Sequence, residues 1–220
     1  MTMLDPSSKE SLAFPPRLLD GLDHAAFEEL CRTTDDETYR LKYSDLDRWV
    51  MYSWKHAAHL GLDTSPPLDI LDLGLGPGYF AYVCQVLGHR CVGLDLPGGS
   101  SFKQALRKWL GIESFVEFAI MPKIPLPPMG RFDLVTAYHC QFNHNLTERR
   151  LWNIEEWTYF LDDLRENVLK PGGRFVLRLT KQTRKGRGGG VMRDDPKLNA
   201  LFQERGAPES KGVIIFDPLT

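Results

Sequence analysis

The sequence has no long apolar run, little cysteine and almost no net charge, and each absence excludes a class of protein. No uninterrupted apolar stretch reaches the roughly 18 residues that a membrane-spanning helix needs. The four cysteines, Cys31, Cys84, Cys91 and Cys140, form no CxxC pair, which favours reduced thiols over a disulfide framework or a zinc site. The formal net charge is −2, so no overall field attracts nucleic acid or an anionic membrane.

The bulk composition is that of a soluble globular protein. The chain has 220 residues, of which 42% are hydrophobic and 25% charged, enough for one domain with its own core. The N-terminus has no basic region followed by an apolar run, so we expect no signal peptide and a cytoplasmic location. We expect a single domain over 1–220, with a helical extension over 1–62 and the core over 63–220.

The hydrophobic pattern changes from helical to strand-like after Gly61. From about residue 23 to residue 60 apolar side chains recur at three- and four-residue steps, which predicts helix. Short β-type runs follow at 68–75, 90–96, 114–120, 131–139, 174–180 and 212–218. Helices are predicted between them over 77–88, 101–110, 147–169 and 195–205. Asn145 or Thr147 is suited to cap the third of these helices.

This alternation predicts an α/β fold with a doubly wound, mainly parallel sheet and right-handed crossovers. The N-terminal helices would then cover one edge of the sheet as a lid. The link at 121–130 is too short and too rich in proline for a helix. The basic, glycine-rich stretch at 181–193 fits either a solvated loop or a surface that gathers an anionic acceptor.

A glycine-rich turn, in the segment ILDLGLGPGYF, directly follows the first expected strand. Asp72, Gly74, Gly76 and Gly78 stand at two-residue steps, and glycine lets the backbone turn sharply and approach a ligand closely. The dinucleotide pattern GxGxxG would need glycine at Tyr79, and the Gly-Lys-Ser/Thr of a P-loop is missing. Ligands of open α/β sheets bind beyond the carboxyl ends of the strands, so this turn is a candidate binding site.

A second acid, Asp95, ends the second expected strand. It lies 17 residues beyond Gly78, close to the roughly 20-residue interval at which an acid meets a ribose diol. A carboxylate there can accept both ribose hydroxyl protons. The alternative, a simple turn acid after a strand, is disfavoured by the glycine turn upstream.

These segments resemble the motifs of class I S-adenosylmethionine-dependent methyltransferases. ILDLGLGPGYF resembles the family's first motif, acid-x-Gly-x-Gly-x-Gly, and Asp95 matches its ribose-binding acid. RFDLVTAYH (131–139) resembles the fourth-strand motif, and LKPGGRFVLRL (169–179) resembles the turn and strand after it. The resemblance covers roughly residues 66–180 and implies a Rossmann-like methyltransferase fold, an enzyme and S-adenosylmethionine as its cofactor.

The resemblance also implies how the glycine turn would hold the cofactor. Gly74, Leu75 and Gly76 would pass close to its methionine part, within the turn that Gly78 completes. Asp72 would bind the methionine amino group, directly or through water.

The adenosine part would be held by residues from the next two strands. Asp95 would hold the ribose, and Leu96 would pack on the adenine. Ile120 and Met121 would lie along the other side of the adenine. The family often has an acid there for the adenine amino group, whereas FAIMPKIP has none.

The end of the fourth expected strand should meet both cofactor and acceptor. Tyr138 and His139 would lie beside the methionine and the transferable methyl group. His139 is the candidate base for an oxygen acceptor, because histidine titrates near neutrality; the alternative is that it only lines the pocket. Gln141, Asn143 and His144 suit a hydroxylated acceptor or, equally, a solvated loop.

We expect no catalytic metal. The fourth-strand region lacks the clustered acids of the family's metal-dependent catechol branch, and His56 and His59 have no identified third ligand. The family's amino-methylating motif is also missing, so we expect a small-molecule acceptor, more an oxygen than a nitrogen, and neither nucleic acid nor membrane as partner. A non-catalytic cofactor-binding module and an NAD(P)-dependent Rossmann oxidoreductase are the alternatives. The oligomeric state stays open, a homodimer included.

Overall fold

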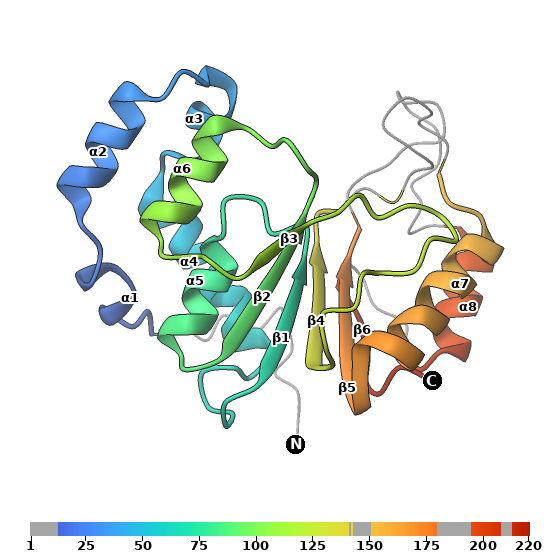
Figure 1. The fold of residues 1–220 in the computed structure, drawn as a ribbon. Helices are drawn as coiled ribbons and strands as arrows, with labels where there is room; N and C mark the ends of the chain where they lie inside the picture. Colours follow the sequence, from blue (N-terminus) through green and yellow to red (C-terminus); the bar gives the residue numbers. More distant parts are fainter. Residues whose placement is uncertain (1–12, 141, 143–150, 180–194, 208–212) are drawn as a thin grey trace. The chain divides into compact units, whose positions relative to one another are not determined.

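The computed structural model describes residues 13–140, 142, 151–179, 195–207 and 213–220. Its strands form a six-stranded sheet in the order β3-β2-β1-β4-β5-β6 (Figure 1). The strands are β1 (Asp69–Leu73), β2 (Arg90–Asp95), β3 (Phe115–Glu117), β4 (Phe132–Tyr138), β5 (Leu169–Arg178) and β6 (Ile214–Phe216). β1 pairs in parallel with β4 and β4 with β5, whereas β6 is antiparallel to β5. The predicted mainly parallel, doubly wound sheet is confirmed.

The helices alternate with these strands as the sequence pattern predicts. They are α1 (Arg17–Asp20), α2 (His24–Thr33), α3 (Glu37–Tyr43), α4 (Leu46–His59), α5 (Tyr79–Val86), α6 (Ser101–Trp109), α7 (Ile154–Asp163), its π-helical continuation η1 (Leu164–Val168), and α8 (Pro196–Glu204). Within the described ranges, none of these helices combines the length and the apolar character that a membrane crossing requires.

The helical pattern between residues 23 and 60 divides into three helices, each started by an aspartate. The side chains of Asp23, Asp36 and Asp45 accept hydrogen bonds from backbone N–H groups of the first turn, at 3.0, 3.3 and 3.1 Å. Such caps satisfy N–H groups that have no partner inside the helix. The region ends as expected, with α4 stopping at His59 and Gly61 at a φ of +71°.

The helix expected over 147–169 begins, in the described residues, at Ile154. Its cap is Asn153, which forms a capping box with Glu156: the backbone N–H of Glu156 donates to Asn153 over 2.9 Å and that of Asn153 to Glu156 over 2.7 Å. The proposed caps Asn145 and Thr147 lie outside the described residues.

The strand expected over 174–180 begins earlier, at Leu169. Leu169 pairs with Phe132 at the start of β4, and a register irregularity separates that pair from the regular pairing that follows. The guanidinium of Arg131 donates to the carbonyl oxygens of Leu169, over 2.7 Å, and of Glu166. The predicted helix end at residue 169 is therefore wrong by one residue, because Leu169 already belongs to the sheet.

The described residues gather into two compact units whose segments alternate along the chain. Unit 1 takes the described residues of Met1–Leu68, Leu75–Gly93 and Gly98–Phe115; unit 2 takes those of Asp69–Gly74, Leu94–Pro97 and Val116–Thr220. The expected division into an extension over 1–62 and a core over 63–220 stays a prediction.

In unit 1, helices pack on helices. α4 packs against α5, α1 contacts both, and α2 and α3 contact α6. The Tyr79 hydroxyl, at the start of α5, donates to the Tyr43 carbonyl over 2.7 Å. Ser100, the cap of α6, donates to Asp36, the cap of α3. Hydrogen bonds between buried or half-buried groups thus connect α3 and the residues that flank it to α5 and α6.

In unit 2, helices α7 and α8 lie beside the strands β5 and β6 (Figure 1), and aromatic side chains of these elements contact one another. Trp157 of α7 is fully buried and lies 4.6 Å from Phe142 and 5.4 Å from Phe202, between ring centroids. Phe202 of α8 lies 5.4 Å from Phe216 of β6. Phe175 of β5 joins the same cluster, with its ring centroid 5.4 Å from that of Phe216, so aromatic contacts connect both strands to the helices.

Candidate functional site

The parallel pairing of β1 and β4 places Asp72 opposite Thr136. Both side chains are buried, Asp72 with 4% of its surface exposed and Thr136 with none. The Thr136 hydroxyl donates to Oδ1 of Asp72 over 2.8 Å. A carboxylate is therefore held inside unit 2 by a neutral donor from the neighbouring strand.

Asp95, the last residue of β2, brings a second carboxylate to Asp72. It is also buried, with 8% of its surface exposed. Burial raises the pKa of Asp72, the Thr136 hydrogen bond lowers it and the charge of Asp95 raises it, and together they bring it to about 7. The two acids repel each other, and a cation bound between them would relieve that repulsion.

Gly74 lies between these acids in the chain and is exposed. Its φ is +78°, which glycine adopts without strain, and its N–H donates to the Leu94 carbonyl over 2.7 Å. A Cβ atom here would lie 2.5 Å from Sγ of Cys140, closer than real Cβ atoms come to any neighbour. Both the backbone angle and the space therefore require glycine.

The Cys140 thiol closes the site from the segment after β4. It donates to the Leu73 carbonyl over 2.9 Å. Burial, and then the charges of Asp72 and Asp95, raise the pKa of Cys140 far above that of a free thiol. Cys140 is thus neutral at physiological pH and adds no third negative charge to the two acids.

The rest of the glycine turn belongs to unit 1, where Leu75 is anchored by packing. Its side chain is buried, and it fills the place above Gly93 of β2. A Cβ at residue 93 would lie 2.4 Å from Cδ2 of Leu75. The side chain of Leu75 therefore fixes the turn against β2 by packing.

Gly76 and Gly78 are held by α6 and the residues just after it. The Arg107 guanidinium Nε donates to the Gly76 carbonyl over 2.6 Å; Arg107 is 2% exposed, and its guanidinium lies 5.0 Å from the Phe115 ring centroid. Gly78 has a φ of +92°, and a Cβ there would lie 3.0 Å from Cγ1 of Ile112. Gly78 is the N-cap of α5, which begins at Tyr79 instead of the expected residue 77.

The residues expected around adenine lie in irregular segments of unit 2. Leu96 follows β2 and is 42% exposed. Ile120 and Met121 are half-buried, and they follow β3 instead of ending it, because β3 stops at Glu117. The strand predicted to reach residue 120 is therefore too long. Further along this link, the Leu126 N–H donates to Asp163 of α7 over 2.9 Å.

Tyr138 and His139 stand at the end of β4. Tyr138 is half-buried, whereas His139 is exposed. His139 has a φ of +58°, which is uncommon outside glycine, and its N–H donates to the Arg178 carbonyl of β5 over 2.9 Å. Gln141, Asn143, His144 and the basic stretch over 181–193 lie outside the described residues.

No group of three metal-ligating side chains occurs within the described ranges. The two histidines of α4, His56 and His59, contact neighbouring residues of the same helix. Nδ1 of His59 lies 2.6 Å from the Lys55 carbonyl oxygen, and the His56 ring packs edge-on against Tyr52 with centroids 4.4 Å apart.

The structure brings together Asp72, Gly74 and Asp95 of the predicted set, all in unit 2. The sequence interpretation missed Thr136 and Cys140. A threonine inside the otherwise apolar LVTAY was the available signal for Thr136, since a polar residue in a buried strand needs a partner. No comparable signal marked Cys140.

Comparisons with solved structures repeatedly find methyltransferases. The 1,6-didemethyltoxoflavin-N1-methyltransferase of Burkholderia thailandensis is 20% identical, with a TM-score of 0.53 over 95% of this chain and 92% of that one. An O-methyltransferase family protein of the same organism is 13% identical, with a TM-score of 0.54 over 90% of this chain and 63% of that one. The chain has the class I methyltransferase fold.

The same methyltransferase fold matches DesVI of Streptomyces venezuelae, which is 15% identical, with a TM-score of 0.53 over 90% of this chain and 99% of that one. No family model and no curated protein sequence matches the chain. The predicted resemblance is thus confirmed for the fold, and the assignment of individual site residues stays a prediction.

Proposed function

We propose that this chain is an S-adenosylmethionine-dependent methyltransferase that acts on a small molecule. The observation that carries the proposal is the pair of buried, mutually repelling carboxylates Asp72 and Asp95 beside an exposed glycine of positive φ, at the place where this fold binds ligands. S-adenosylmethionine carries an ammonium group, a sulfonium group and a ribose diol, which suit such a pair.

The residues present fit this cofactor. Asp72 would accept from its ammonium group, and Asp95 from its ribose hydroxyls. Gly74, which tolerates no side chain, would let the methionine part pass close to the backbone. Leu96, Ile120 and Met121 would supply apolar contacts to the adenine. When bound, S-adenosylmethionine supplies an already activated methyl group, so the protein must mainly align the acceptor and exclude water.

The acceptor would lie near the end of β4. His139 is exposed there, and its backbone is fixed to β5 through Arg178, so it is the proposed base for a hydroxyl acceptor. Tyr138, the residue before it, would line the same region. The similar solved structures include one named for O-methyltransferases and one for an N1-methyltransferase. We propose oxygen because of His139.

The test is calorimetric titration with S-adenosylmethionine. We expect saturable binding by the wild type and binding about a hundredfold weaker by Asp95→Asn, since two charge-assisted hydrogen bonds are lost. The matched control is Asp69→Asn, which alters a carboxylate at the opposite end of β1 and should bind like the wild type.

Three outcomes contradict the proposal: no saturable binding by the wild type, an Asp95→Asn protein that binds equally well, or a larger thermal shift with NAD than with S-adenosylmethionine. If binding occurs, release of S-adenosylhomocysteine with a panel of phenols and alcohols separates an enzyme from a module that only binds.

A further inference from the structure

The Thr136 hydroxyl has two acceptors within reach. Oγ1 lies 2.8 Å from Oδ1 of Asp72 and 3.5 Å from the carbonyl oxygen of Leu71. A hydroxyl can donate one hydrogen bond and accept others, and its proton rotates to suit. Thr136 is fully buried, so water does not compete for these positions.

We infer that Thr136 is a positioning residue that holds Asp72 ready to capture the ammonium group of the ligand. The inference rests on the proposed function, because that ammonium group belongs to the proposed cofactor. It assigns a role to a residue that touches no reacting atom and acts through Asp72.

The two acceptors let Thr136 serve both protonation states of Asp72. With Asp72 ionised, the hydroxyl donates to Oδ1 over the shorter distance. With Asp72 protonated, the hydroxyl can accept from the carboxyl group and donate to Leu71. The side chain of Asp72 thus keeps its place through a change of charge, and ligand binding costs no rearrangement.

The groups that face Asp72 set the pH at which this change occurs. Burial raises its pKa most, Thr136 from β4 lowers it and the charge of Asp95 from β2 raises it, with a net value of about 7. Cys140, from the segment after β4, feels the charge of Asp72 and is itself neutral. Affinity for an ammonium ligand should therefore rise with pH through neutrality, as Asp72 loses its proton.

The experiment is a pH series of calorimetric titrations with S-adenosylhomocysteine, which has the ammonium group but no sulfonium charge. Thr136→Val keeps the shape and removes the donor, so the pKa of Asp72 should rise by about one unit. The affinity ratio of wild type to Thr136→Val should then fall from about ninefold at pH 6 to about twofold at pH 8. The ligand's own amine titrates identically for both proteins and cancels from the ratio.

Thr136→Ser is the conservative control and should stay within about twofold of the wild type at every pH, because it keeps the hydroxyl. Thermal unfolding checks that both variants are folded. A ratio for Thr136→Val that is the same at all pH values would mean a merely structural role and would overturn the inference while leaving the proposed function intact. A wild type that binds no ligand at any pH overturns both.

Discussion

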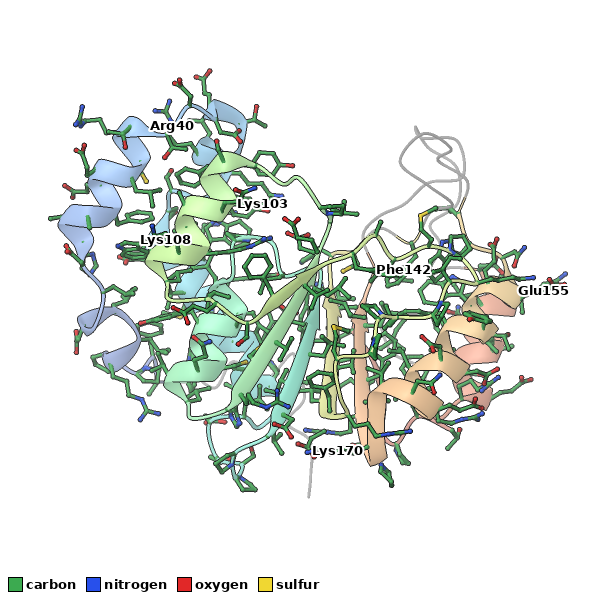
Figure 2. All side chains as sticks on the ribbon, viewed as in Figure 1. Arg40, Lys103, Lys108, Phe142, Glu155 and Lys170 are labelled. Atoms are coloured by element: carbon green, nitrogen blue, oxygen red, sulfur yellow. The ribbon has the colours of Figure 1, made fainter. Side chains whose placement is uncertain are left out.

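Each end of β1 carries an aspartate that is paired with an aspartate of a neighbouring strand, Asp133 of β4 at the amino end and Asp95 of β2 at the carboxyl end, and the two pairs differ in burial and in partner. At the amino end, the ammonium group of Lys170, which Figure 2 labels, lies 2.7 Å from Asp69 and 2.8 Å from Asp133, and all three side chains are half-exposed. At the carboxyl end, Asp72 and Asp95 are buried, and Asp72 meets a hydroxyl instead of a cation.

This difference separates a structural cluster from a candidate binding site. Hydrogen bonds to Asp133 and Asp69 raise the pKa of Lys170, so each acid of this cluster has a cationic partner within the protein. At the carboxyl end, burial and, to a smaller extent, the charge of Asp95 raise the pKa of Asp72. A protein gains nothing in stability from burying repelling carboxylates. Under the proposed function, the positively charged cofactor would offset that repulsion.

The largest expected effect is a pH-dependent stabilisation by Asp72→Asn in the ligand-free protein. The folded-state pKa of Asp72, about 7, lies above its ordinary value of 3.8, so the folded state binds more protons between those pH values. Wild-type stability should therefore fall as pH rises from 4 to 7 and level off above. The stability of Asp72→Asn relative to wild type should grow by about 4 kcal/mol from pH 4 to pH 8, measured by urea unfolding. Parallel pH curves for the two proteins would show that Asp72 is not the titrating group.

A smaller effect is expected from Gly74→Ala, about 2–3 kcal/mol of destabilisation. Part comes from the positive φ and part from contact with Cys140. The matched control is Gly172→Ala near the amino end of β5. There φ is +76° and nothing lies within 4 Å of an added Cβ. Gly172→Ala should lower the free energy of unfolding only by the cost of the positive φ, about 1–2 kcal/mol.

The double variant Gly74→Ala, Cys140→Ala should recover the steric part, giving a favourable coupling energy in urea unfolding. Equal losses for Gly74→Ala and Gly172→Ala, with no coupling to Cys140, would show that the thiol does not crowd residue 74.

The smallest effect is expected from Lys170→Met at the amino end. The side chains are half-exposed, so these ion pairs contribute little to the free energy of unfolding and weaken in salt. Urea unfolding at low and high salt measures the loss, and S-adenosylmethionine titration should show no change in affinity. A change of affinity would mean that the two ends of the strands are not independent.

The sequence predicted the inner strands well and the element ends poorly. The buried apolar runs of β1, β2 and β4 locate those strands within a few residues, because consecutive apolar positions suit strands covered on both faces. Three capping aspartates that divide the N-terminal helices could have been recognised, as could the Asn153–Glu156 capping box. The early start of β5 could not, because it depends on pairing with Phe132.

The site was predicted as far as its residues carry a local signal. Asp72, Gly74 and Asp95 follow from a glycine turn and strand ends. Thr136 depends on the register of β1 against β4, which one sequence does not determine. The place of Cys140 depends on the positive φ of His139, which is uncommon outside glycine and which the sequence pattern did not indicate.

The missing side chain of Gly93 has a consequence for protein engineering. The leucine of the turn occupies the space that any larger residue at this position of β2 would need. Grafting the segment LDLGLGPG onto another scaffold should therefore fail to reproduce its shape unless the adjoining strand receives a glycine as well. The shape of the glycine turn after β1 thus depends on β2 as well, although β2 carries no recognisable sequence motif.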